Sequence, residues 1–177
     1  MNIYKKNLNW LKQNSVYKES MEHDACGVGL VASTEGVKSR KVVEYGIQAL
    51  KAVWHRGAID ADGKTGDGAG IHIEIPKDFF IEKIEITGHR HDDSDLCVGM
   101  IFLPRNDYQG QEKCRIIVES ELTKKNFNIY GWRQVPVNPS VLGEKAENTR
   151  PEITQVLFKH NDKKVVGKDL ERALYET

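Results

Sequence analysis

Four glycines fall within eight residues of this chain, between a stretch with helical periodicity and one that alternates. They are Gly63, Gly66, Gly68 and Gly70. Glycine weakens helices and strands but adopts backbone angles that other residues avoid, so residues 60–70 predict a loop of unusual conformation. The loop lacks the Lys-Ser/Thr pair of a phosphate-binding loop and runs into a predicted strand rather than a helix. A tight structural loop is therefore favoured over a nucleotide site.

The stretch before this loop, residues 41–54, predicts a helix. Its apolar residues recur at helical spacing: Val43, Ile47, Leu50 and Trp54. Ser39 is suited to cap the N-terminus, and Gly57 to end the helix in a left-handed conformation. The chain therefore has one well-defined helix directly before its glycine-rich loop.

Further elements follow from shorter patterns. Predicted strands cover residues 26–32, 71–75 (stopped by Pro76), 96–103 (ended by Pro104), 128–135 and 153–158. Predicted helices cover residues 112–125, with Cys114, Ile117, Val118 and Leu122 on one side, and residues 169–177. The remaining segments are a loosely ordered leader over residues 1–24 with one helical turn over residues 8–11, a turn over residues 33–36 and an exposed polar segment over residues 86–95. This mixture of strands and helices predicts an α+β protein packed in layers.

Composition excludes several classes of function. The 177 residues carry 26 basic and 26 acidic side chains, so no electrostatic surface for nucleic acid or an anionic membrane is expected. No apolar run approaches the roughly 20 residues that cross a bilayer. The N-terminal stretch has no long apolar segment typical of a secretion signal, which favours a cytoplasmic protein.

Cys26 is the first candidate for chemistry. It follows Ala25 and is flanked by Gly27 and Gly29, which would let a substrate approach the backbone. Cleavage of the Ala25–Cys26 bond would create an α-amino group with a pKa of about 8, able to act as a local base for the thiol. The alternative is a small buried side chain in a strand, because free cysteines are often buried and inert. Three widely spaced cysteines argue against a disulfide scaffold.

Arg56 and two histidine-containing segments are the other candidates. The Arg56 guanidinium can bond the last carbonyls of the helix, or it can align a carboxylate near a nucleophile. His23-Asp24 and residues 89–93 superficially resemble metal ligands, but their spacing matches no zinc pattern, and a solvated loop is favoured for the second. A non-catalytic thiol or metal-binding module, with Cys26 and His23 as ligands, remains an alternative.

Several of these segments together resemble one family. Residues 22–30 (EHDACGVGL) resemble the processing site of glutamate synthase large subunits, and residues 46–70 (GIQALKAVWHRGAIDADGKTGDGAG) are close to their signature. Residues 98–104, 130–136 and 142–144 resemble the same family, so the similarity covers nearly the whole chain from Glu22. The length of the match over residues 46–70 argues against another class II amidotransferase, such as one for amino sugars or purines.

The resemblance implies a fold, a reaction and partners. It implies an N-terminal nucleophile hydrolase fold of four αββα layers, of which residues 26–177 form the N-terminal part after removal of a propeptide, residues 1–25. Cys26, freed as the first residue, would attack the side-chain amide of glutamine, while Arg56 and Gly57 would help order the substrate site. No cofactor is implied for this segment. FMN and an iron–sulfur cluster are expected in the remaining domains of the large subunit, which would aminate 2-oxoglutarate with electrons from a small subunit or another donor.

Two departures from the family pattern are visible. The family takes its oxyanion donors from an Asn-Gly pair in a later motif, and the sequence contains no Asn-Gly dipeptide. Because the family's domain is also longer, the chain is expected to be an incomplete, inactive fragment. Leu30 stands where the family often has an aromatic residue.

Overall fold

The computed structural model describes residues 3–15, 27–53, 59–66 and 68–177. By its contacts the chain forms two compact units, Met1–Gly57 and Ala58–Thr177. Among the described residues, the first unit contains two helices, and the second contains the sheet, four further α-helices and a short 3-10 helix.

The first unit begins with helix α1, Ile3–Asn14. The prediction of a single turn around Leu8 was wrong, because the segment has neither glycine nor proline to interrupt a helix. Helix α2, Arg40–Ala52, confirms the predicted helix, although it ends two residues earlier. The Ser39 side chain accepts a hydrogen bond from the backbone N–H of Lys41, so the predicted cap is confirmed. The predicted ending at Gly57 lies outside the described residues.

Between these helices, the described residues 27–32 do not form the buried strand predicted over residues 26–32. They lack regular secondary structure, and Val28 and Leu30 are exposed. An apolar run becomes a strand only when another strand pairs with its backbone, and none of the described residues does so here. The predicted turn that follows is confirmed, with the Gly36 N–H donating to the Ser33 carbonyl at 3.3 Å.

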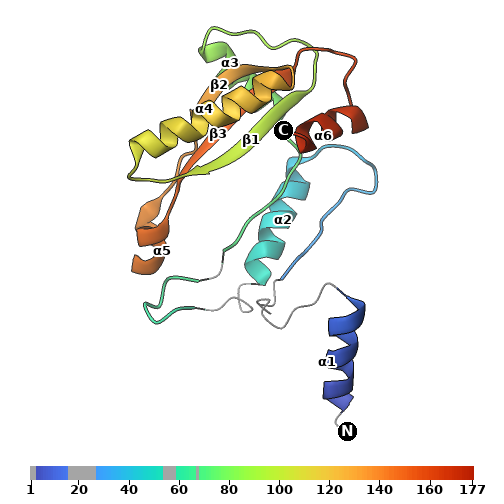
Figure 1. Ribbon diagram of the computed structural model, residues 1–177, viewed down its shortest axis with the longest axis vertical. Helices are drawn as coiled ribbons and strands as arrows, with labels where there is room; N and C mark the ends of the chain where they lie inside the picture. The colour runs from blue at the N-terminus through green and yellow to red at the C-terminus, as the bar shows by residue number, and fades with distance from the viewer. Residues whose placement is uncertain (1–2, 16–26, 54–58, 67) are drawn as a thin grey trace. The chain divides into compact units, whose positions relative to one another are not determined.

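The second unit is built on a three-stranded antiparallel sheet in the order β1-β3-β2 (Figure 1). Strand β1 is Leu96–Leu103, β2 is Phe127–Gln134 and β3 is Glu152–His160. All three were predicted, and β1 has the predicted bounds because Pro104 ends its apolar run. Strand β3, the last in sequence, lies in the centre and pairs with both neighbours.

Helix α4, Tyr108–Lys124, and helix α6, Lys168–Tyr175, cover one face of the sheet. Buried residues join them in one core: Cys97, Leu122, Phe127, Val156, Phe158 and Leu170. Val118 packs against this core as predicted, but Ile117 is 61% exposed and points away from it. The predicted face of α4 was therefore shifted, and the buried Gln111 was missed.

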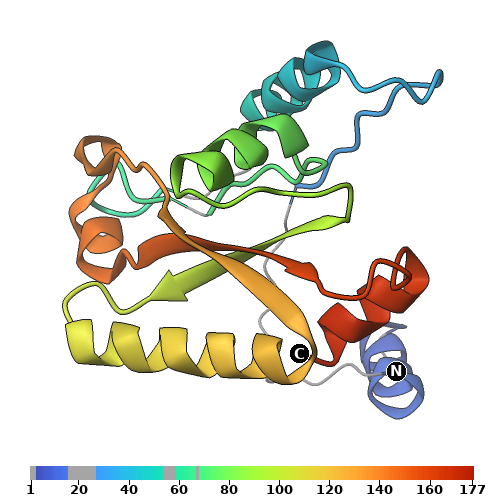
Figure 2. The same cartoon turned by 90° about the horizontal axis from the view of Figure 1, so that it is seen from above.

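Helix α3, Lys77–Ile86, covers part of the opposite face (Figure 2). Phe80 and Ile84 on this helix are buried against Leu96, Tyr130 and Leu157 of the sheet. This helix was missed, and the strand predicted over residues 71–75 is wrong, since these residues lack strand pairing. Pro76, expected to stop a strand, instead precedes the first turn of α3.

The connection from β2 to β3 covers residues 135–151. It contains a 3-10 helix, η2, Pro139–Val141, and helix α5, Glu144–Thr149. Among the described residues, no helix is long and apolar enough to cross a membrane.

Candidate functional site

The residues predicted to carry the chemistry lie outside the described part of the chain. These are Ala25, Cys26, Arg56 and Gly57, together with the possible metal ligand His23. Their described neighbours are informative nevertheless. A Cβ added at Gly27 would lie 3.8 Å from the Cβ of Val53, an ordinary van der Waals distance. Gly27, the residue after Cys26, therefore lies beside Val53 at the end of α2. Val53 comes three residues before Arg56 in the sequence.

The glycine-rich loop is confirmed and is held by its own hydrogen bonds. An isolated bridge joins Ile59 to Gly66, and the Asp60 N–H donates to the Thr65 carbonyl at 2.7 Å. Gly63 has a φ of 70°, a conformation that favours glycine. The loop is thus a closed turn with its two ends side by side.

Asp62 is the centre of this turn. Its carboxylate accepts hydrogen bonds from the Thr65 hydroxyl and from the backbone N–H groups of Thr65 and Lys64, at 2.7 and 2.9 Å. These bonds, the hydroxyl first, hold the pKa of Asp62 well below its ordinary value. The carboxylate therefore stays charged and keeps the turn closed at neutral pH.

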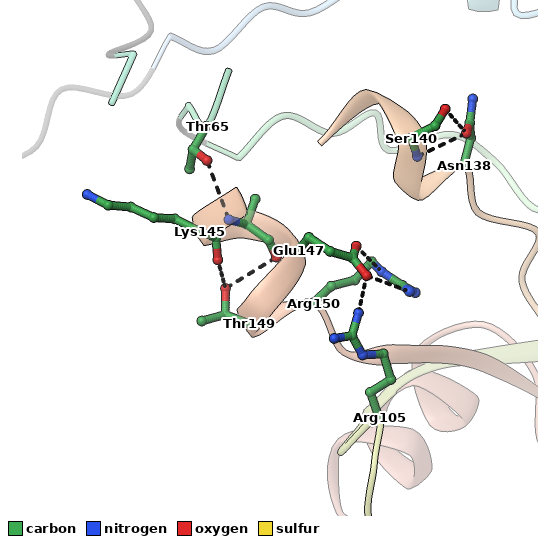
Figure 3. A network of polar contacts seen from close by, with 9 residues as sticks. Thr65, Arg105, Asn138, Ser140, Lys145, Glu147, Thr149 and Arg150 are labelled. Atoms are coloured by element: carbon green, nitrogen blue, oxygen red, sulfur yellow. Dashed lines mark hydrogen bonds and ion pairs between the residues drawn. The ribbon is translucent and has the colours of Figure 1, made fainter. Parts of the chain in front are cut away.

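The turn docks on the beginning of helix α5. The Lys145 ammonium contacts the Asp60 carboxylate at 2.7 Å. The Ala146 N–H donates to the Thr65 hydroxyl at 3.4 Å (Figure 3). Gly143 makes the approach possible, because a Cβ there would overlap the Asp62 carboxylate and lie 2.6 Å from the Thr65 backbone nitrogen. The structure thus brings residues 60–65, from the longer of the segments that carry the resemblance, against the segment over residues 142–144 and the start of α5.

Helix α5 is in turn tied to the ends of two strands. Glu147 pairs with Arg150 at 2.8 Å and with Arg105 (Figure 3). Arg105 follows β1 and Arg150 precedes β3. Hydrogen bonding to Arg150 is the main cause that lowers the pKa of Glu147, with desolvation opposing it and Arg105 reinforcing it. The network is structural in character, since each of these charged groups has a protein partner.

The segment over residues 86–95 is partly buried rather than uniformly exposed. His91 bonds the Tyr130 hydroxyl at 2.9 Å through Nδ1 and the Ser94 carbonyl at 3.1 Å through Nε2. Asp92 pairs with Lys159 at 2.7 Å and Lys163 at 2.9 Å. Burial is the main cause that raises the pKa of Tyr130, to about 12.

Metal ligation was a second possibility for these histidines. No group of three or more His, Cys, Asp or Glu side chains that could hold a metal gathers among residues 3–15, 27–53, 59–66 and 68–177. Cys97 is buried and Cys114 is half-buried, and both are free thiols. An iron–sulfur cluster is held by several cysteine thiolates, and the described residues do not supply that ligand set.

Comparison with known proteins identifies the family. Residues 26–177 match the family model of the class-II glutamine amidotransferases. The chain belongs to this family. The amidotransferase match begins at Cys26, the residue singled out as the candidate nucleophile, and covers both units except the first 25 residues.

Relatives of this amidotransferase chain include glutamate synthases whose names carry NADPH, ferredoxin or NADH. It is 54% identical to the glutamate synthase [NADPH] large chain of Azospirillum brasilense over 161 residues, which are 91% of this chain and 11% of that protein. It is 39% identical over 155 residues to a ferredoxin-dependent glutamate synthase of Arabidopsis thaliana, covering 87% of this chain and 9% of the relative. For the glutamate synthase [NADH] of Saccharomyces cerevisiae the identity is 36% over 151 residues, covering 82% and 7%. The chain thus spans about a tenth of the length of the relatives it matches.

Sequence reasoning missed the contact between the loop and α5. Asp62 and Thr65 were seen only as part of a glycine-rich segment, and Gly143 only as part of a family motif. The available signal was that both segments, residues 46–70 and 142–144, resemble the same family. No local pattern indicates that residues about eighty positions apart are in contact.

Proposed function

We propose that this chain carries the glutaminase activity of a glutamate synthase, hydrolysing glutamine to glutamate and ammonia with Cys26 as the nucleophile. The observation that carries the proposal is that the family match begins at residue 26. A nucleophile at the first position of the mature domain would have its own α-amino group as a base. The same observation supports the proposed domain boundaries, with residues 1–25 as a propeptide and residues 26–177 as the N-terminal part of the amidotransferase domain.

The proposed reaction proceeds in two steps. The Cys26 thiol loses its proton to the α-amino group, and the sulfur attacks the amide carbon of the glutamine side chain. The amine then gives the proton to the leaving nitrogen, and ammonia departs to leave a glutamyl thioester. Water, deprotonated by the same amine, attacks the thioester and releases glutamate and the free thiol.

Arg56 and Gly57 are proposed to order the glutamine site. A guanidinium presents a planar set of donors that suits the carboxylate of an amino acid substrate. One observation supports this role: Gly27, which follows Cys26 in the sequence, lies in van der Waals contact range of Val53, which comes three residues before Arg56.

The four-layer αββα sandwich is the proposed complete fold. On the described sheet, helices α4 and α6 cover one face. The other face is only partly covered by α3, and the β1 side chains Met100 and Phe102 remain 50% and 63% exposed. A helix layer on one side and uncovered apolar side chains on the other are what one half of such a sandwich would present.

The remaining parts of a glutamate synthase would complete the reaction. Ammonia would pass to a domain with FMN and an iron–sulfur cluster, where 2-oxoglutarate is aminated. The relatives' names include NADPH, NADH and ferredoxin. The proposed source of electrons is a small subunit or another electron donor. A cytoplasmic location, without nucleic acid or membrane partners, stays a prediction.

The decisive experiment replaces Cys26 in the complete enzyme. Cys26→Ser is expected to abolish glutamine-dependent glutamate formation and to spare the ammonia-dependent reaction, since only the first needs the thioester. Cys114→Ser is the control and should keep both activities, because this half-buried thiol lies on α4. Full glutamine-dependent activity in Cys26→Ser would refute the assignment.

Processing is tested by mass spectrometry. The mature enzyme is expected to begin at Cys26, and an active enzyme that retains Met1 or Asn2 would exclude the amine as base. Residues 1–177 by themselves are expected to release little ammonia from glutamine. The Cys26 amine is then part of a peptide bond, and the absence of an Asn-Gly pair removes a donor worth roughly 10²–10³-fold in kcat.

The alternative, a metal-binding module using Cys26 and His23, makes the opposite prediction. Stoichiometric zinc in the purified protein, lost in Cys26→Ser, would favour it. Both residues lie outside the described part of the chain, so the alternative stays open to this measurement.

A further inference from the structure

A recess of the second unit lies between the end of strand β1 and the start of strand β3. Its walls are formed by residues 102–106 and residues 148–151, and its volume is about 370 Å³. Small-molecule sites commonly have volumes of about 300–1,000 Å³. The recess is therefore large enough for a small ligand.

The walls of this recess carry positive charge and no acidic side chain. Arg105 and Arg150 line it together with Asn106 and Asn148. Both guanidinium groups reach the same carboxylate, that of Glu147, which is not part of the walls (Figure 3). Two guanidinium charges on one carboxylate leave the recess with an unbalanced positive charge.

The pairing with Glu147 leaves several N–H groups of the two arginines without a partner. Arg105 donates to Glu147 through Nη1, and Arg150 donates through Nε and Nη2. The other guanidinium nitrogens, Nε and Nη2 of Arg105 and Nη1 of Arg150, donate to no residue in the described part of the chain. A guanidinium has five N–H donors in a fixed plane, so both groups can hold a second oxyanion beside Glu147.

These donors are already held in place. Only 25% of the Arg105 side chain and 17% of the Arg150 side chain are exposed. The buried Gln111 amide donates to the Arg105 carbonyl at 3.2 Å, and the Arg150 N–H donates to the Glu147 carbonyl at 3.4 Å. A ligand therefore avoids much of the entropy loss that ordering two long side chains would require.

Two further acids lie close to the walls in the sequence, but neither pairs with the arginines. The Asp107 carboxylate accepts from the Gly110 N–H at 2.8 Å and caps helix α4. The Glu152 carboxylate acts electrostatically on Arg150, yet its hydrogen bond is with the Gln134 amide at 2.6 Å. Among the described residues, Glu147 is thus the one acid that forms ion pairs with these arginines.

We propose that this recess binds a small oxyanion, a carboxylate or a phosphate group, through the free N–H groups of Arg105 and Arg150 and the side-chain amides of Asn106 and Asn148. The planar guanidinium fork matches two oxygens of either group. Solvent still reaches both arginines, so a dissociation constant on the order of 1 mM is expected. The proposal does not rest on the glutaminase activity, because it uses only side chains of the second unit.

The test is a titration of the ¹⁵N-labelled 177-residue chain, followed by NMR at the Nε–H signals of Arg105 and Arg150. Sodium phosphate and sodium glutarate are added separately, and sodium chloride at matched ionic strength is the reference. A saturable shift of both signals with either anion is expected, and the anion that saturates identifies the group that the site takes. No saturable shift with either anion, or equal shifts with chloride, would overturn the proposal.

Three variants locate the site. Asn106→Asp places a negative charge in the recess without removing either arginine and should weaken binding at least about tenfold. Asn138→Asp is the matched control. It makes the same charge change at an exposed position outside the walls, where an aspartate can still cap η2, and it should bind within about twofold of wild type.

Arg105→Gln removes guanidinium donors and should also weaken binding at least about tenfold. Its urea midpoint is measured beside the affinity, because Glu147 loses one partner in this variant. Asn106→Asp keeps both ion pairs, so the test stands even if Arg105→Gln does not fold. Unchanged affinity in Asn106→Asp, or equal weakening in Asn138→Asp, would overturn the proposal.

Discussion

Gln111 offers a measurable test of how the sheet is joined to helix α4. It is 6% exposed, and its side-chain amide donates to the carbonyls of Pro104 and Arg105, at 2.8 and 3.2 Å. The side chain thus closes the connection between β1 and α4. Arg105 in this connection also pairs with Glu147, so Gln111 supports the contacts that lead to the glycine-rich turn.

Replacement of Gln111 should be costly for the free energy of unfolding. Each net hydrogen bond is worth about 1 kcal/mol, and each buried methylene about 0.8 kcal/mol. Gln111→Ala is therefore expected to lower the free energy of unfolding by roughly 3 kcal/mol. Gln111→Leu keeps most of the volume and should cost about 1–2 kcal/mol, because the two carbonyls lose their donor.

Urea unfolding of the 177-residue chain, followed by circular dichroism, measures these values. Glu112→Ala is the matched control on the neighbouring position. Its side chain is 65% exposed and, among the described residues, forms an ion pair with Arg115, so a change below about 0.5 kcal/mol is expected. If Gln111→Ala were as small as this control, the hydrogen bonds to the connection would not contribute to stability, and the reasoning would be refuted.

Three other predictions rest on burial. Burial, with a smaller contribution from Asp95, raises the pKa of the Cys97 thiol to about 11. Iodoacetamide at pH 8 should therefore label Cys97 at least about 100-fold more slowly in the native chain than in the unfolded chain. Half-buried Cys114 should react faster than Cys97 in the native chain, and equal rates would contradict this prediction. The pKa of Cys97 is raised from 9.0 to about 11 and that of Tyr130 from 10.0 to about 12, so the folded state keeps these protons to a higher pH than the unfolded state. Their contribution to stability is fully present below pH 9 and should be lost between pH 9 and 12. Cys97→Ala is the check, because its stability should fall less steeply over this range. On α4, Val118→Lys should destabilise the chain strongly and Ile117→Lys hardly at all in the same unfolding assay, since only Val118 packs on the core; the reverse order would contradict the described helix face.

Local signals allowed elements of both units to be predicted. Strand β1 has its predicted bounds because a continuous apolar run is ended by Pro104, which cannot continue a paired strand. The start of α2 was predicted because the Ser39 hydroxyl can satisfy a free N–H at a helix end. These features depend on residues a few positions apart, which a sequence displays directly.

The errors arose where a pattern needed a distant partner. Residues 27–32 and 71–75 are apolar enough for strands, but a strand requires another backbone to pair with, and the described structure supplies none for them. Ile117 has helical spacing with the core residues of α4, yet the sheet contacts the neighbouring stripe of that helix.

The candidate site divides in the same way. The sequence by itself determined the family, through long motifs around Cys26 and Arg56, and it determined which thiol is the proposed nucleophile. Only the tertiary structure decided that Gly143 lies against Asp62 and Thr65, and that this contact is tied to the sheet through Glu147. Local periodicity reflects forces between near neighbours, whereas the close approach of residues about eighty positions apart depends on how the intervening strands and helices pack.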